Sequence, residues 1–169
     1  MVATVIINEK NDAGAKTPKT SATVRFKNDD NSDVDTLDPM VVPTGNSDYS
    51  FEKWLQLECT VAPDTEITNG EVYCDGTLFG GTDVEIWGKV ITAFATPAEG
   101  TGTTGTPSTP TATANIEGWT TGAAQALTLG TVTGIGDMGD HVVLVMEVTS
   151  SATQGTLAAE TLTFRYDEI

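Results

Sequence analysis

The alternation of apolar and polar residues along the chain predicts short β-strands rather than helices. In the segment 49–61, Leu55, Leu57, Cys59 and Val61 are spaced two apart, with polar residues between them. A two-residue period is typical of strands with one buried face. The same reasoning predicts further strands at 2–7, 22–26, 40–42, 67–74, 84–90, 127–135, 141–149 and 157–167. No segment keeps a helical period over three turns.

The number and spacing of these strands predict an all-β fold. Segment 141–149 has apolar residues on both faces, which favours a central strand covered on both sides. Turn signals such as Pro63-Asp64, Asp75-Gly76 and Gly80-Gly81 separate the strands, and Gly134 to Gly139 is expected to be a turn. We therefore expect a β-sandwich of Greek-key or jelly-roll type. A single domain over 21–169 would follow an N-terminal strand or arm and loop over 1–20.

Two segments are expected to lie outside the sandwich. Residues 2–7 are β-branched and apolar, which suits a flexible N-terminal arm that adds a strand to a neighbouring sheet. Residues 97–118 are rich in Thr, Gly and Pro and lack periodicity. Such a segment buries too little area to offset its ordering entropy, which predicts a long loop.

Composition limits the classes of partner. The 169 residues carry a formal net charge of −16, and the sequence pI is about 4.1. A surface this acidic repels nucleic-acid phosphates and anionic membranes, so we expect neither as a partner. No stretch resembles a signal peptide or approaches ~20 apolar residues. We therefore expect synthesis in the cytoplasm.

Residues that could carry chemistry are few. His141 is the single histidine, and no nucleophile and orienting partner accompany it. Cys59 and Cys74 match no zinc spacing, which leaves two buried thiols or a bridge between adjacent strands as alternatives. The sequence thus predicts a non-enzymatic protein with no catalytic residue, no cofactor site and no metal site.

One acidic loop partly matches a calcium-binding pattern. Asp29, Asn31, Asp33 and Asp35 alternate as oxygen ligands, as at the start of an EF-hand loop. That loop requires glycine at its sixth position and glutamate at its twelfth, where this chain has valine and methionine. A solvated acidic loop is the favoured interpretation, with calcium binding as the alternative.

Large apolar side chains supply the candidate interface residues. Tryptophans are most often packing anchors or interface hot spots, and a sugar-stacking platform is the alternative. Together with the N-terminal arm, the candidates are Val2, Val5, Ile6, Ile7, Trp54, Trp87 and Trp119.

Two stretches resemble a group of tailed-bacteriophage particle proteins. The first is YSFEKWL at 49–55, followed by ITNG at 67–70 and Asp75-Gly76. The second is VVLVMEV at 142–148, followed by TQG at 153–155 and TLTFRYDE at 161–168. The group has an aromatic-E-K-W-[LI] strand start and an I-x-N turn, and the similarity covers residues 48–95 and 140–169.

The resemblance implies a structural protein of the virion, made in the host cytoplasm. It suggests a capsid decoration (cement) protein that binds the major capsid protein lattice as a homo-oligomer, for example a trimer. A host-receptor or carbohydrate-binding module of a tail or head fibre is the alternative. Tail fibres usually show repeats or long stalks, and this chain shows no internal repeat.

Overall fold

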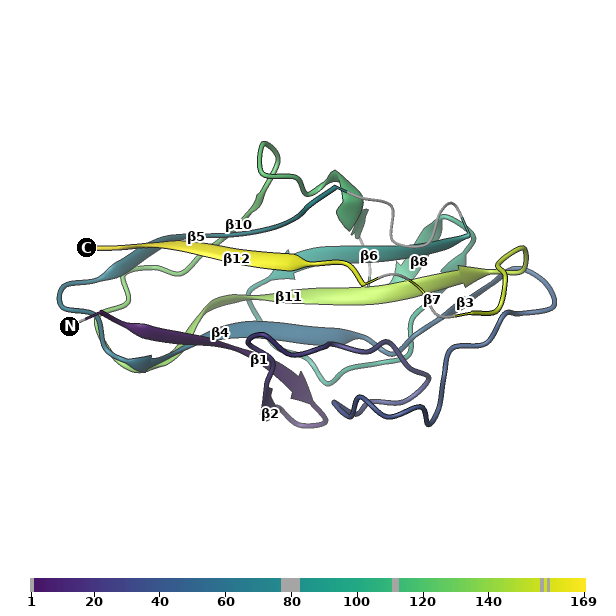
Figure 1. The fold of residues 1–169 in the computed structure, drawn as a ribbon, viewed down its shortest axis with the longest axis horizontal. Coiled ribbons are helices and arrows are strands. Elements are labelled where there is room, and N and C mark those ends of the chain that lie inside the picture. The colour runs from purple at the N-terminus through teal and green to yellow at the C-terminus, as the bar shows by residue number, and fades with distance from the viewer. Residues whose placement is uncertain (1, 77–82, 111–112, 156, 158) are drawn as a thin grey trace.

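The computed structural model describes residues 2–76, 83–110, 113–155, 157 and 159–169, which form a β-rich fold (Figure 1). The strands are β1 (Thr4–Asn11), β2 (Ala15–Pro18), β3 (Ser47–Tyr49), β4 (Lys53–Val61), β5 (Ile67–Cys74), β6 (Val84–Ile91), β7 (Thr101–Thr103), β8 (Thr106–Thr109), β9 (Ala114–Asn115), β10 (Gln125–Leu127), β11 (Gly136–Thr149) and β12 (Leu162–Glu168). One short 3-10 helix, η1 (Ile116–Gly118), follows β9. The predicted all-β, sandwich-like class is confirmed.

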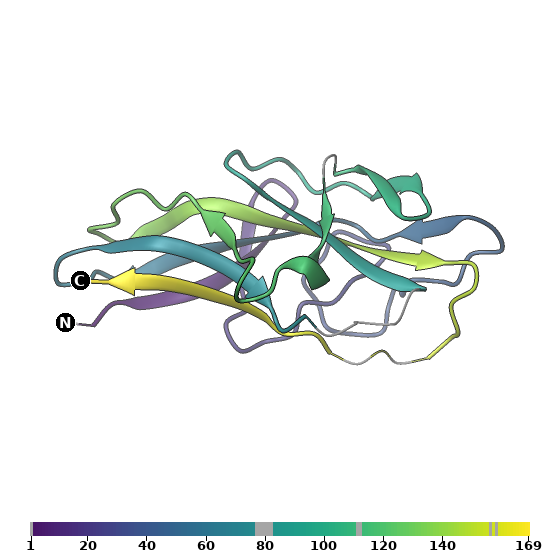
Figure 2. The same cartoon turned by 90° about the horizontal axis from the view of Figure 1, so that it is seen from above.

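The strands form one large sheet, one small sheet and a separate hairpin. The large sheet has the order β2-β1-β4-β11-β6-β9, and β3 pairs with the far end of β11. The small sheet has the order β10-β5-β12, and the hairpin joins β7 to β8. All strand pairings are antiparallel. Figure 2 shows that both termini lie at the end of the molecule where β4 turns into β5.

The apolar core lies between the two sheets. Leu55, Leu57 and Cys59 of β4 face this core, as do Val142 and Leu144 of β11. The small sheet contributes Ile67 and Val72 of β5, Leu127 of β10, and the partly buried Leu162, Phe164 and Tyr166 of β12. We call this side of the large sheet its inner face. The two-residue period read from β4 and β11 therefore identifies core residues correctly.

The small sheet covers only part of the inner face. Farther along β11, Met146 and Val148 pack with Val84 in a second apolar cluster. This cluster is covered by irregular chain: Phe26, Met40 and Val42 on one side, and Ala152 and Leu157 on the other. The segment 19–43, which we call the covering loop, thus replaces the small sheet over this half.

The predicted N-terminal arm is instead an internal strand. Residues 4–11 form β1, which lies between β2 and β4 in the large sheet. Val5 and Ile7 pack against the core because the pairing places them on the inner face beside Cys59 and Leu57. Hydrogen bonding to β2 on one edge and to β4 on the other outweighs the conformational entropy that a terminal segment has in isolation. Val2, before the strand, is 80% exposed.

The predicted long loop at 97–118 is largely ordered against the sheet. It contains β7, β8, β9 and η1, and Ile116 is buried in the core. Gly100 lies where an added Cβ would fall 2.5 Å from Val145 and 2.8 Å from Tyr49. Glycine lets the backbone approach the large sheet closely, and the sheet supplies the partners that the segment's own composition lacks.

Several strand predictions require smaller corrections. Segments 22–26 and 40–42 are not strands, and Lys27 and Pro39 form only an isolated bridge. Segment 127–135 contributes only the end of β10, whereas much of the expected turn at 134–139 belongs to β11. A register shift between Met138 and Val142 lets β11 continue through these glycines. The predicted Gly80-Gly81 turn lies outside the described residues.

Candidate binding surfaces

The EKW run at the start of β4 fastens three parts of the chain to the large sheet. Glu52 accepts hydrogen bonds from the Trp54 indole at 2.8 Å and from the Ala98 amide at 3.3 Å. Trp54 packs edge-on against Phe94 and His141, with ring centroids 5.2 and 5.7 Å away. Lys53 points to the opposite face, toward the covering loop. Glu52, Lys53 and Trp54 are therefore determinants of the fold.

A buried ion-pair network anchors the covering loop. Lys53 Nζ lies 3.1 Å from Glu9 Oε1, and neither side chain is exposed. Lys19 Nζ lies 3.4 Å from Glu9 Oε2. Lys53 also donates to the Asn31 carbonyl at 2.6 Å, and Lys19 donates to the Ser32 carbonyl at 2.6 Å. The two ammonium groups thus satisfy loop carbonyls that no strand reaches.

A third buried lysine is surrounded by the acidic loop. Lys27 Nζ donates to Asn31 Oδ1 at 3.1 Å and to Asp35 Oδ1 at 2.5 Å. The hydrogen bond from Lys27 lowers the pKa of Asp35, and a backbone amide adds to the effect. A calcium ion using Asn31 and Asp35 would have to displace this lysine. In the described residues, no group of three or more His, Cys, Asp or Glu is placed to hold a metal ion.

His141 is part of a packed polar cluster on the opposite, outer face. Lys10 Nζ lies 3.2 Å from His141 Nε2 and 3.1 Å from Asp137 Oδ2. Burial lowers the pKa of His141, and the charge of Lys10 lowers it further. Burial alone would raise the pKa of Asp137, but hydrogen bonds from Lys16 and Lys10 outweigh it and lower the pKa. This arrangement disfavours the protonated imidazole, and the contacts with Trp54 and Phe94 give the ring a packing role.

The two cysteines are free and buried. Of the two alternatives, buried thiols or a bridge between adjacent strands, the structure has the first. Cys59 lies on β4 in the large sheet, whereas Cys74 lies on β5 in the small sheet. Cys74 donates to the Ile116 carbonyl at 2.8 Å. Burial raises the pKa of both thiols, so neither has the character of a reactive thiolate.

The sugar-stacking platform of tryptophans, the alternative to a packing or interface role, does not form. Trp54 and Trp119 are each 3% exposed, Trp54 on the outer face and Trp119 in the core between the sheets. Trp87 is half-buried and donates to Glu147 at 2.8 Å. Trp54 and Trp119 are therefore packing residues that cannot serve the interface predicted for them. Ile6 is half-buried within β1.

Burial of lysines leaves few cations among the surface charges, although the net charge is unchanged because equal numbers of cations and carboxylates are buried. Four of the eight cationic side chains are buried, against four of the 24 carboxylates. The buried groups are Lys10, Lys19, Lys27 and Lys53, with Glu9, Glu52, Asp140 and Glu147. Of the remaining cations, Lys16 and Arg165 form ion pairs with carboxylates of this chain. This distribution could not be predicted from the sequence, since it depends on which lysines the fold encloses.

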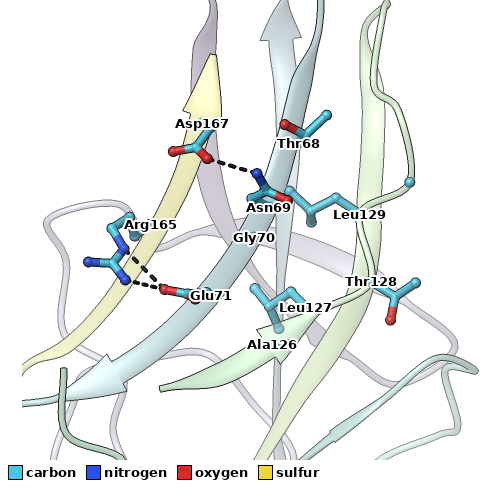
Figure 3. A pocket seen from close by; sticks show the side chains of 11 residues that line it. Thr68, Asn69, Gly70, Glu71, Ala126, Leu127, Thr128, Leu129, Arg165 and Asp167 are labelled. Carbon is cyan, nitrogen blue, oxygen red and sulfur yellow. Dashed lines mark hydrogen bonds and ion pairs between the residues drawn. The ribbon is translucent and has the colours of Figure 1, made fainter. Parts of the chain in front are cut away.

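A groove of about 770 Å³ crosses the small sheet (Figure 3). On one side, Arg165 of β12 pairs with Glu71 of β5, and Asn69 donates to Asp167 at 2.9 Å. On the other side lies the segment after β10, with Leu129 over Gly70. Strand alternation predicts that Arg165 points outward, but the groove itself depends on how the segment after β10 packs.

No protein-family model, curated protein or solved structure matches the chain. The described part contains no helix with the length and apolar character of a transmembrane span. Fold and surface chemistry therefore carry the functional argument.

Proposed function

We propose that the protein is a non-enzymatic structural component of a tailed-bacteriophage particle, where it decorates and stabilises the capsid shell. The observation that carries this proposal is the one-sided surface charge. Half of the cations are buried, and two of the other four pair with carboxylates of the same chain. Such a surface is suited to dock on a cationic protein surface, and an assembled lattice presents one repeatedly.

The resemblance of residues 49–55 and 142–148 to phage particle proteins supports the same proposal. In this fold the first run leads from the end of β3 into the start of β4, and the second run forms half of β11. Strands β4 and β11 are the central strands of the large sheet. A protein that binds the assembled shell but not its free subunits converts binding energy into particle stability. The proposed partner is the major capsid protein lattice, and a homo-oligomer on the shell, such as a trimer, follows local lattice symmetry.

Quantitative mass spectrometry of purified particles tests this function. We expect the ratio of copies of this chain to copies of the major capsid protein to be near one, or a simple fraction of one. A few copies per particle would place the protein on a tail, portal or fibre. Absence from the particle would overturn the virion proposal.

The groove on the small sheet favours a second candidate function, carbohydrate binding on a tail or head fibre. Its planar polar groups, Asn69, Glu71, Arg165 and Asp167, are of the kind that hydrogen-bond to sugar hydroxyls. A volume of about 770 Å³ lies within the range of small-molecule sites. A glycan-array signal that Asn69→Ala abolishes and Trp87→Ala leaves intact would favour this function over decoration.

A further inference from the structure

Exposed apolar side chains gather at the end of the molecule where the termini meet. Val2, Ile135 and Ile169 are 80%, 73% and 67% exposed, and Val61 is 37% exposed. Among the described residues, the other exposed large apolar side chains are Val34, Leu37 and Val41, all in the covering loop. Single exposed apolar residues are ordinary, but a group of them at one place marks an interaction site.

Strand pairing brings these residues together. Thr4, two residues after Val2, pairs with Val61. Gly136, the residue after Ile135, pairs with Cys59, two residues before Val61. Ile169 and Glu66 exchange two backbone hydrogen bonds, of 2.9 and 3.2 Å. We call the segments 2–4, 60–66, 130–136 and 166–169 the terminal tip, which lies at the left of Figures 1 and 2.

The described side chains of the terminal tip include acidic groups and no basic group. Its four segments include the carboxylates of Asp64, Glu66, Asp167 and Glu168, and they contain no Lys or Arg. Asp167 and Glu168 are exposed at the end of β12, and Glu168 accepts a hydrogen bond from the Ala3 amide at 2.6 Å. An apolar group with acidic residues around it is complementary to an apolar group with basic residues around it.

We infer that the terminal tip is the surface that docks onto the shell, against a protein patch with an apolar centre and a Lys- or Arg-rich rim. This inference rests on the proposed function and deepens it. A second copy of this chain is a poorer occupant, because two facing tips would bring both sets of carboxylates together. The acidic rim also disfavours an anionic membrane or nucleic acid as the occupant.

The test uses phage particles stripped of this protein and measures binding of the full chain by co-sedimentation. The tip variant combines Ile135→Ser with Val61→Thr. The matched control is Leu37→Ser, since Leu37 is 66% exposed on the covering loop, which packs at the far end of β11. That end lies about 45 Å away for a strand of this length. All three are surface changes, and thermal unfolding should be nearly unaltered.

We expect the tip variant to weaken binding by about tenfold or more, because its docking surface buries less apolar area on binding. The control should bind as the wild type does. A second variant, Glu66→Gln with Asp167→Asn, should bind with less dependence on salt concentration. Equal binding of wild type and tip variant would overturn the docking surface and leave shell binding intact.

Two other outcomes distinguish the remaining possibilities. Failure of the wild-type chain to bind stripped particles would overturn the proposed function and the docking surface together. Sedimentation equilibrium of the wild-type chain alone is expected to show no association through the tip. A dimer that Ile135→Ser dissociates would identify a second copy as the occupant and overturn the assignment to the shell.

Discussion

The inner face of the large sheet is covered in two different ways. Near the terminal tip, β1 and β4 present Val5, Ile7, Leu57 and Cys59 to the small sheet. Toward the other end of the same strands, the inward side chains become Glu9 and Lys53, which lie beneath the covering loop.

The inward side chains differ because the small sheet and the covering loop differ in how their own backbone groups are hydrogen-bonded. The small sheet pairs its own backbone groups and presents apolar side chains. The covering loop has little strand pairing, so its carbonyls at Thr23, Asn31 and Ser32 accept hydrogen bonds from lysines instead. Burying loop carbonyls without hydrogen-bond donors would destabilise the fold, and so would burying a lysine without the carboxylate of Glu9. Loop and ion pair are therefore mutually dependent.

The largest effect is expected from breaking the ion pair beneath the loop. Lys53→Met leaves Glu9 fully buried with Lys19 as its remaining cationic partner and a long hydrogen bond from Asn11, and it removes the donor to the Asn31 carbonyl. We expect a loss of about 3–5 kcal/mol in the free energy of unfolding, measured by urea denaturation. The double variant Glu9→Gln with Lys53→Met should recover part of this loss. A single-variant loss below about 1 kcal/mol would show that the network is not a stabilising unit.

A smaller effect is expected from overpacking the apolar half. A Cβ on Gly88 would lie 2.7 Å from Trp119, 2.8 Å from Ile116 and 2.9 Å from Leu144. These are core side chains that must move, so Gly88→Ala should lower the free energy of unfolding by about 1–3 kcal/mol. The loss should not depend on salt, in contrast to changes at exposed charges. Gly122→Ala is a matched control, because a Cβ there meets nothing within 4 Å.

The polar cluster on the outer face should make stability depend on pH. Burial holds the folded-state pKa of His141 below its ordinary 6.5, so the unfolded chain takes up a proton first on acidification. Stability should therefore fall as pH drops from about 6.5 toward the lowered pKa. The pKa of Glu85 is raised by burial, and this group acts in the opposite direction.

The contribution of His141 is isolated by comparing the wild type with His141→Gln. Urea denaturation between about pH 7.5 and 5 should show a flatter pH profile for the variant. Parallel profiles would mean that the imidazole is not held neutral by its surroundings.

The smallest effect is expected at the exposed ion pair of the small sheet. Arg165 and Glu71 are both well exposed, at 54% and 36% of their side chains. Solvent screens such a pair and side-chain entropy opposes it, so Arg165→Met should leave the urea midpoint unchanged within error. A loss comparable to that of Lys53→Met would show that the exposed pair contributes as much to the free energy of unfolding as the buried pair does.

The sequence was most informative where a segment pairs along its whole length. In residues 67–74 the phase of Val72 and Cys74 indicates a strand, as does that of Val84 and Ile86 in residues 84–90, and these segments match β5 and β6 almost residue for residue. It was least informative where the chain packs without pairing. Phe26, Met40 and Val42 are apolar and spaced like strand residues, yet they hold an irregular loop against the second apolar cluster. The groove and the terminal tip were missed because each combines segments far apart in the chain.

The all-β class, the main core strands and the acidic character are evident without the structure, because they depend on local periodicity and on residue counts. The folded arrangement was needed to show that β1 is internal, that four lysines are enclosed, and that Val61, Ile135 and Ile169 lie at the same end of the molecule. Each of these depends on which strands pair and in what register. Pairing is a property of contacts between distant segments, and the local pattern of one segment does not specify it.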